Sequence, residues 1–494
     1  MFRFKVFENG VPAKKVDVEG AHLLGSDRVP LRAAISFANG EVVCEPRARG
    51  TAALALMWPV PGRGHLMLET TRLVERKAPY NLHVELARGE LMRISQKRED
   101  WGLYDFVEAQ ALYERVDQAK ALLVDAMTAA DKVESARLGD AAIAASVEVA
   151  EAISVFHAEL ILQRRIEVRK IVKRPLGCIV HDLPGIRNQL PRLAEAFDFA
   201  SLPFNWRLIE PRESKYQPEP LEQCLQLLRK SKMPIWGRAL LSFDKAYLPE
   251  WLRSWARDYE GLRERVIRQI KYVLRQFGAH VRAWEVISGL HAHNPFGLSF
   301  EQIMDLTRTT AALVKQMSPR SKAILGIVLP WGEYYAHDPK TIPPLLYAEM
   351  VVESGINFDA FGLDLRFGGD DAGEGTDRLS RRYVRDMLHV SAMLDRFANL
   401  GKPLHVTATG VPSAGGGGPA GCWGKAWTPD VQAEWVRNFY QIAFSKPQVD
   451  TVAWHTLADS EGGGGDGLLT QDLAPKPAWK TLLEFRKQLA PGQS

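Results

Sequence analysis

The sequence predicts a (β/α)8 TIM barrel that is preceded by a small β-sandwich and a two-helix segment. From about residue 170 onward, apolar strand-like runs alternate with amphipathic helical stretches, and there are eight such units. This alternation is typical of parallel sheets, and eight units favour a closed barrel over an open sheet. Before residue 170 the pattern differs, with short alternating strands first and Ala- and Leu-rich helices afterwards.

The composition is that of a globular protein, with 46% apolar and 25% charged residues among 494. The net charge of +4 is small for this length, and no Lys/Arg block suggests a nucleic-acid partner. The four cysteines are far apart and lack metal-ligand spacing, so we expect buried reduced thiols. We also expect no metal and no cofactor. We find no signal-peptide pattern and no membrane-length apolar run, which predicts a cytoplasmic location and no membrane partner.

Residues 1–105 are predicted to form the β-sandwich. Their short apolar runs are separated by Gly, Pro or Asn turns, as in many small all-β modules. Some modules of this kind bind sugars, so a carbohydrate-binding role is an analogy at the level of fold. The expected strands are FRFKVF, VPLRAAISF, EVVCEP, TAALALMWPV, HLMLETTRL and YNLHVELAR.

Residues 106–169 are predicted to form a helical hairpin. Apolar residues recur at three- and four-residue steps in two long Ala- and Leu-rich stretches, joined near ESARLGD at 134–140. Two interpretations remain open for this hairpin. It packs against a neighbouring part of the chain, or it forms the interface of a homo-oligomer.

Residues 170–494 are predicted to form the barrel. Function is then expected at the carboxyl ends of the strands and in the loops that follow them. The Gly-rich stretches 413–424 and 460–467 lack the spacing of a phosphate-binding loop and are interpreted as adaptable loops at the barrel mouth. The eight predicted strands lie within 176–182, 197–204, 233–243, 281–288, 322–330, 358–367, 403–411 and 449–457.

Seven motifs follow one another through this second part of the chain. They include FNWRLIEP at 204–211, AWEVIS at 283–288, LHVTATGV at 404–411 and PKPAW at 475–479. Their order resembles that of glycoside hydrolase family 10, the xylanase family, over about residues 172–488. The resemblance implies a barrel and an oligo- or polysaccharide partner.

The resemblance also implies two catalytic glutamates, a proton donor and a nucleophile, about 5–5.5 Å apart. In this chain the first position falls on Gly289 and the second on Ala408. Neither residue can protonate a glycosidic oxygen or form a glycosyl ester. Ordinary endo-1,4-β-xylanase activity is therefore not expected, and the chain is interpreted as a glycan-binding pseudoenzyme.

Four charged residues are expected at the barrel mouth: Arg238, Glu333, Asp364 and Arg366. Asp364 and Glu333 come from neighbouring strands and form the best remaining pair for acid/base chemistry. The two arginines indicate an acidic glycan, because a guanidinium can bind a carboxylate through two hydrogen bonds. In the alternative interpretation, Arg366 forms a structural ion pair with Asp364.

Other residues allow both a functional and a structural role. Tryptophans at strand ends stack on sugars or simply pack the barrel. His291 and His293 have the H-x-H spacing of metal ligands, but no carboxylate motif is nearby. Glu285 is interpreted as a structural hydrogen-bonding residue that points into the barrel. The expected substrate-binding residues are Asn205, Trp206, Trp236, Arg238, Arg366, Trp454 and His455.

Three functions therefore remain open. The first is glycan binding without hydrolysis, and the second is hydrolysis of another glycan through the relocated carboxylates Asp364 and Glu333. The third is a structural or assembly role that uses the helical segment. Saturable binding without turnover would favour the first function, cleavage that depends on the two carboxylates the second, and absence of both the third.

Overall fold

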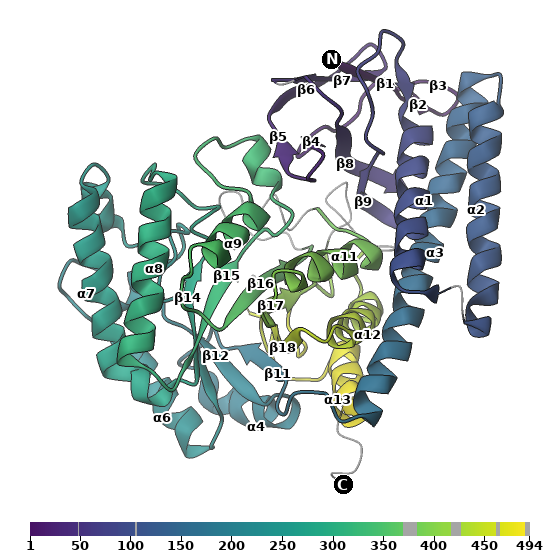
Figure 1. Cartoon of the computed structure of the whole chain (residues 1–494). Helices are drawn as coiled ribbons and strands as arrows, with labels where there is room; N and C mark the ends of the chain where they lie inside the picture. The colour runs from purple at the N-terminus through teal and green to yellow at the C-terminus, as the bar shows by residue number, and fades with distance from the viewer. Residues whose placement is uncertain (48, 104–105, 369–382, 416–425, 461–464, 490–494) are drawn as a thin grey trace.

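A computed structural model describes residues 1–47, 49–103, 106–368, 383–415, 426–460 and 465–489. Its second part is a closed barrel of eight parallel strands in chain order (Figure 1). All eight predicted strand regions are thereby confirmed, whereas the two Gly-rich stretches lie largely outside the described residues. The strands are β11 (Leu176–Ile179), β12 (Phe199–Pro203), β13 (Ile235–Arg238), β14 (Ala283–Ser288), β15 (Lys322–Ile327), β16 (Ala360–Arg366), β17 (Leu404–Gly410) and β18 (Val449–Trp454).

Helices surround the barrel and pack apolar side chains against it. Side chains of Asp258, Ser299, Asp386 and Thr428 accept backbone N–H bonds at four helix N-termini. The short α5 (Trp206–Ile209) follows β12. The longer helices are α4 (Ile186–Ala196), α6 (Glu219–Lys230), α7 (Tyr259–Phe277), α8 (Phe300–Met317), α9 (Pro344–Glu353), α11 (Met387–Ala398), α12 (Pro429–Ser445) and α13 (Pro477–Leu489).

The N-terminal part contains two four-stranded sheets, ordered β10-β1-β7-β6 and β5-β4-β8-β9, which confirms a β-rich region before the barrel. Phe2 and Phe4 of one sheet share a core with Leu54 and Leu56 of the other. The strands are β1 (Phe2–Lys5), β4 (His22–Leu24), β5 (Pro30–Leu31), β6 (Ala33–Ala38), β7 (Glu41–Pro46), β8 (Ala53–Val60), β9 (Gly64–Glu69) and β10 (Tyr80–Asn81), with a separate hairpin of β2 (Phe7–Glu8) and β3 (Val11–Pro12).

The prediction of a strand in YNLHVELAR is wrong, since helix α1 (Leu82–Asp100) begins after two residues of strand β10. Leu82, Leu86 and Glu90 recur at helical spacing and are buried, so tertiary packing overrides the apolar alternation. The predicted join at 134–140 is also wrong. Helix α2 (Gln110–Thr128) ends earlier, and α3 (Lys132–Glu167) begins after Asp131, whose side chain accepts the Glu134 N–H.

Helix α3 lies against α1 and α2 and reaches the barrel helix α12, as Figure 1 shows. Near its end, Arg165 donates to the carbonyls of Phe444 and Lys446. Among the described residues, α3 is the helix that is long and apolar enough to cross a membrane. However, 56% of its most apolar 18-residue window is buried inside the protein. The packed-hairpin interpretation thus agrees with the structure, and oligomerisation through this segment stays a prediction.

The N-terminal part meets the barrel where β9 and α1 face α11. The Met67 N–H donates to the Val384 carbonyl over 2.8 Å, and the Lys97 ammonium lies 2.9 Å from the Asp395 carboxylate. Gly89 lets α1 approach β9 closely, because a Cβ there would lie 1.9 Å from the Glu69 carbonyl oxygen. The absence of a side chain at this position therefore fixes how α1 sits on the sheet.

We expect Gly89→Ala to destabilise the fold by about 2 kcal/mol, because the added methyl overpacks a backbone contact. An ordinary Gly→Ala change inside a helix would instead stabilise it by up to about 1 kcal/mol. Urea denaturation followed by circular dichroism measures the difference. Gln118→Ala, on an exposed position of α2, serves as the control and should change stability little. A Gly89→Ala protein as stable as wild type would contradict the packing argument.

Candidate functional site

An arginine crosses the interior of the barrel at its mouth. Arg238, the last residue of β13, is 6% exposed. Its guanidinium donates to Asp364 Oδ2 on β16 and to the Thr407 carbonyl on β17, each over 2.8 Å. Its Nε also lies 3.5 Å from Glu285 Oε2 on β14. One side chain thus connects four strands of the barrel wall.

Asp364 receives a second guanidinium, from Arg366. Arg366 Nε lies 2.7 Å from Oδ1 and its Nη2 lies 2.8 Å from Oδ2, while its Nη1 is 3.4 Å from His455 Nε2. The ion pair that the alternative interpretation expected between Arg366 and Asp364 is therefore present. Both arginines engage a carboxylate of the protein itself, which weakens the argument that they recognise an acidic glycan.

Burial sets the protonation of this cluster. Burial alone would lower the pKa of Arg238, but Glu285 and Asp364 raise it, so the guanidinium stays charged. Burial raises the pKa of Glu285, and the neighbouring Arg238 offsets only part of that shift. Glu285 therefore lies inside the barrel in the structural role that the sequence analysis gave it.

Glu333 follows β15 and begins the short helix η5 (Glu333–Ala336), where it is 4% exposed. Its carboxylate forms a close ion pair with Arg385. Glu333 and Asp364 line one cavity of about 30 Å³, so the structure does bring the two predicted carboxylates to the same place. That volume accommodates a few water molecules rather than a sugar ring, and each carboxylate already faces a guanidinium.

The two positions that the resemblance assigns to catalysis lie at the carboxyl ends of barrel strands. Gly289 directly follows β14 with a φ of +72°, and a Cβ there would lie 2.7 Å from a Val328 methyl carbon. Ala408 is fully buried in β17, where it pairs in register with Asp364. Neither position has room for a glutamate without movement of its neighbours.

Of the predicted sugar-stacking tryptophans, Trp206 and Trp454 are buried and Trp236 is partly buried. Trp206 is 2% exposed and donates to Glu210, and Trp454 is fully buried and donates to the Asp466 carbonyl. Trp236 stacks on Phe199 with ring centroids 4.1 Å apart. These contacts are those of barrel packing. The remaining predicted binding residue, Asn205, donates to the Ala246 carbonyl over 3.1 Å.

His291 and His293 have different surroundings. His291 is fully buried, its Nε2 lies 3.0 Å from the Val328 carbonyl, and burial lowers its pKa to about 3. His293 Nε2 instead lies 3.7 Å from the Asp244 carboxylate. The H-x-H spacing therefore serves two separate structural contacts, and the described residues around it include no further ligand cluster.

A roomier cavity of about 450 Å³ opens where β11 and β18 end. His455 was expected there from the sequence, and it stacks edge-to-face with His181 at 4.7 Å. The other residues were missed, although His181 and Asp182 are the last two residues of a predicted strand, which is the signal that could have found them. The polar side chains that line this cavity are His181, Asp182, Gln189, His455, Thr456, Asp459, Ser460, Asp466 and Gln471.

The closed parallel barrel with polar side chains at its strand ends places this chain in the (β/α)8 class. No protein-family profile matches it. Endo-1,4-beta-xylanase B of Thermotoga neapolitana is 22% identical to it over 295 residues, which covers 57% of this chain and 78% of the xylanase. The predicted resemblance to family 10 xylanases is thereby confirmed, at low identity.

Solved structures that are similar to this chain include a xylanase and a GH10 protein. Xylanase 10B from Thermotoga maritima is 17% identical, with a TM-score of 0.48, over 67% of this chain and 98% of the xylanase. The GH10 structure from Paenibacillus barcinonensis is 16% identical, with a TM-score of 0.49, over 65% of this chain and 97% of the other.

We expect Arg238→Met to destabilise the protein by about 3–5 kcal/mol at pH 8, because it removes the cation beside buried Glu285 and one of the two guanidinium groups that hold Asp364. The loss should shrink towards pH 5. Without Arg238 the pKa of Glu285 rises further above its unfolded value, so the folded variant takes up a proton and gains stability as the pH falls.

Denaturation curves at several pH values test this prediction. Arg253→Met, at an exposed position, should change stability by less than about 0.5 kcal/mol at every pH. A small and pH-independent loss in Arg238→Met would contradict the role assigned to the ion pair.

Proposed function

We propose that the barrel binds a neutral oligosaccharide at its mouth and does not cleave it by the retaining mechanism of xylanases. The observation that carries this proposal is the pair Gly289 and Ala408, two buried residues without an ionisable group at the positions where the related enzymes need glutamates. Without a carboxylate at either position, double displacement has neither its acid nor its nucleophile.

The surroundings of Asp364 support the same conclusion. A retaining nucleophile needs a free carboxylate oxygen, and a general acid needs a raised pKa. Both oxygens of Asp364 accept hydrogen bonds from guanidinium groups, which occupy lone pairs that a nucleophile needs. This carboxylate is therefore suited to holding the barrel mouth together rather than to attacking a sugar.

The cavity at the ends of β11 and β18 is the binding site that we propose. Its volume of about 450 Å³ lies within the range of small-molecule sites. Amide, imidazole and hydroxyl groups in its wall can exchange hydrogen bonds with sugar hydroxyls. Asp182 and Asp466 also line it, and carboxylates at the wall favour a neutral glycan over an acidic one.

The similarity to an enzyme named as an endo-1,4-beta-xylanase makes xylo-oligosaccharides the first ligands to test. A glycan array that also contains acidic xylan fragments would test neutral and acidic ligands side by side. We expect saturable binding of a neutral oligosaccharide and no release of reducing sugar.

His181→Ala and Gln189→Ala should each weaken binding of that glycan at least tenfold in isothermal titration calorimetry. Both residues line the cavity, and each substitution removes a hydrogen-bonding group from its wall. His337→Ala, which removes an exposed histidine at another site, is the matched control and should bind as wild type does. Binding that is unaffected by both cavity variants would overturn the assignment of the site.

A second function, hydrolysis by relocated carboxylates, is supported by the shared cavity of Asp364 and Glu333. If any glycan on the array is cleaved, Asp364→Asn and Glu333→Gln should each abolish the cleavage, with circular dichroism spectra unchanged. Cleavage that survives both substitutions would exclude this pair. Absence of binding and of cleavage would instead favour a structural or assembly role.

A further inference from the structure

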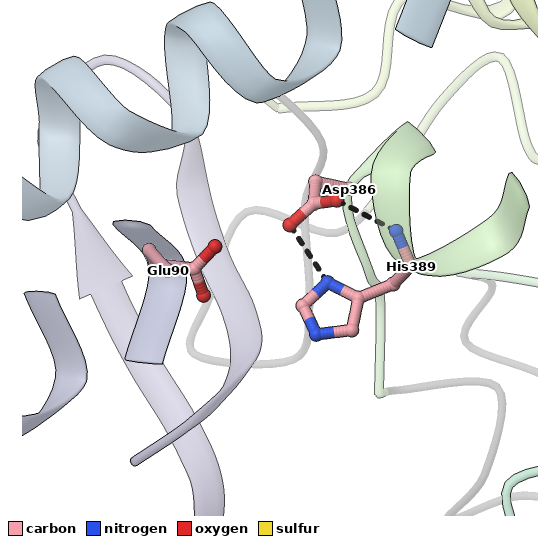
Figure 2. A group of neighbouring side chains, drawn as sticks. All are labelled: Glu90, Asp386 and His389. Carbon is pink, nitrogen blue, oxygen red and sulfur yellow. Dashed lines mark hydrogen bonds and ion pairs between the residues drawn. The ribbon is translucent and has the colours of Figure 1, made fainter. Parts of the chain in front are cut away.

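A second polar cluster lies outside the barrel mouth, at the contact between α1 and α11. It consists of Glu90, Asp386 and His389, shown in Figure 2. Glu90 and Asp386 are fully buried, and His389 is 3% exposed. One donor atom from each of the three residues lies within 4.8 Å of the other two. Burial of three such groups together needs an explanation, because each loses its hydration.

The hydrogen bonds of the cluster leave two buried atoms without a partner. Asp386 caps α11 by accepting the His389 N–H over 2.9 Å, and its other oxygen lies 2.8 Å from His389 Nδ1. His389 Nε2 and Glu90 Oε2 are buried and have no hydrogen-bond partner among the described residues. In Figure 2 the Asp386 carboxylate lies above the imidazole, and Glu90 lies to the left of both.

We propose that Glu90, Asp386 and His389 bind a divalent transition-metal cation, for which Zn²⁺ is the best candidate. One imidazole and two carboxylates form a nitrogen–oxygen donor set that suits zinc, and three protein ligands leave a position for water. Asp386 Oδ2 and His389 Nδ1 lie 2.8 Å apart, close enough to bind one cation together. The cation then takes the place of the hydrogen between these two atoms, and Nε2 carries the ring proton, because a ligating imidazole nitrogen must be deprotonated.

The neighbouring charges permit this assignment. Arg93 is buried beside Glu90 and forms a close ion pair with it, but it also lies 3.7 Å from the Glu69 carboxylate. Glu69 is joined to Arg28 as well, at 2.5 Å. Arg93 therefore keeps a carboxylate partner when Glu90 turns to a metal, so no guanidinium is left buried and unpaired.

A route from solvent also reaches the cluster. A cavity of about 200 Å³ lies between the N-terminal part and the barrel, and both His389 and Arg93 line it. A hydrated cation can thus reach the histidine without unfolding of the contact. Because Glu90 lies on α1, His389 on α11 and Asp386 at the N-cap of α11, the bound cation would join the N-terminal part to the barrel.

The experiment uses the full-length protein treated with EDTA and then dialysed. We expect it to bind one equivalent of Zn²⁺ in competition with a chromophoric chelator, and its melting temperature to rise by several degrees on zinc addition. Co²⁺ should bind at the same site and give visible absorption bands typical of low coordination number. Glu90→Gln and His389→Gln should each weaken zinc binding at least tenfold and remove the thermal shift.

Glu85→Gln is the matched control, because Glu85 is a buried glutamate on the same helix outside the cluster. It should bind zinc as wild type does. No stoichiometric zinc or cobalt binding by the wild-type protein would overturn the proposal, as would binding that is equal in wild type and both ligand variants. If the ligand variants fail to fold, two measurements on the wild-type protein test the proposal instead: displacement of bound Co²⁺ by Zn²⁺, and X-ray absorption of the Co²⁺ ligands. A Co²⁺ ligand set without an imidazole would overturn the proposal.

Discussion

The ion pair between Arg238 and Asp364 is the constraint on which the barrel mouth depends. A guanidinium that is 6% exposed must stay paired, so β13, β14, β16 and β17 are held in one arrangement by its partners. The same pair limits the reactions in which Asp364 can take part, because Arg238 occupies its carboxylate next to Ala408. Ala408 and this ion pair therefore belong to the same part of the barrel, since Ala408 pairs in register with Asp364.

The barrel and its motifs could be predicted because they depend on local patterns. Alternation of apolar strands and amphipathic helices gave the eight strands, and the strand-end positions of Arg238, Asp364 and Arg366 followed from the strand assignment. Helix α1 could not be found in this way. The segment YNLHVELAR alternates like a strand, but in the structure Leu82, Leu86 and Glu90 lie on the buried face of a helix that packs on α3 and approaches β9 through Gly89.

The partners of the site residues were harder to predict than their positions. The sequence placed Arg366 near Asp364, two residues apart on one strand. It gave no sign that Arg385 would reach Glu333 or that Glu90 would face His389, because these contacts join distant parts of the chain. For the same reason no metal was expected: its proposed ligands have no common motif, and spacing reveals only ligands that are close in sequence.

The two polar centres of the molecule are connected through adjacent residues at the start of α11. Arg385 pairs with Glu333 and lines both the small cavity at the barrel mouth and the larger one beside His389. Asp386, the next residue, caps α11 and holds His389. A cation on Asp386 would therefore restrain the backbone that positions Arg385, and through it Glu333. The N-terminal part would then act on the barrel mouth through this contact, even though its own sheets contribute no side chain to the β11–β18 cavity.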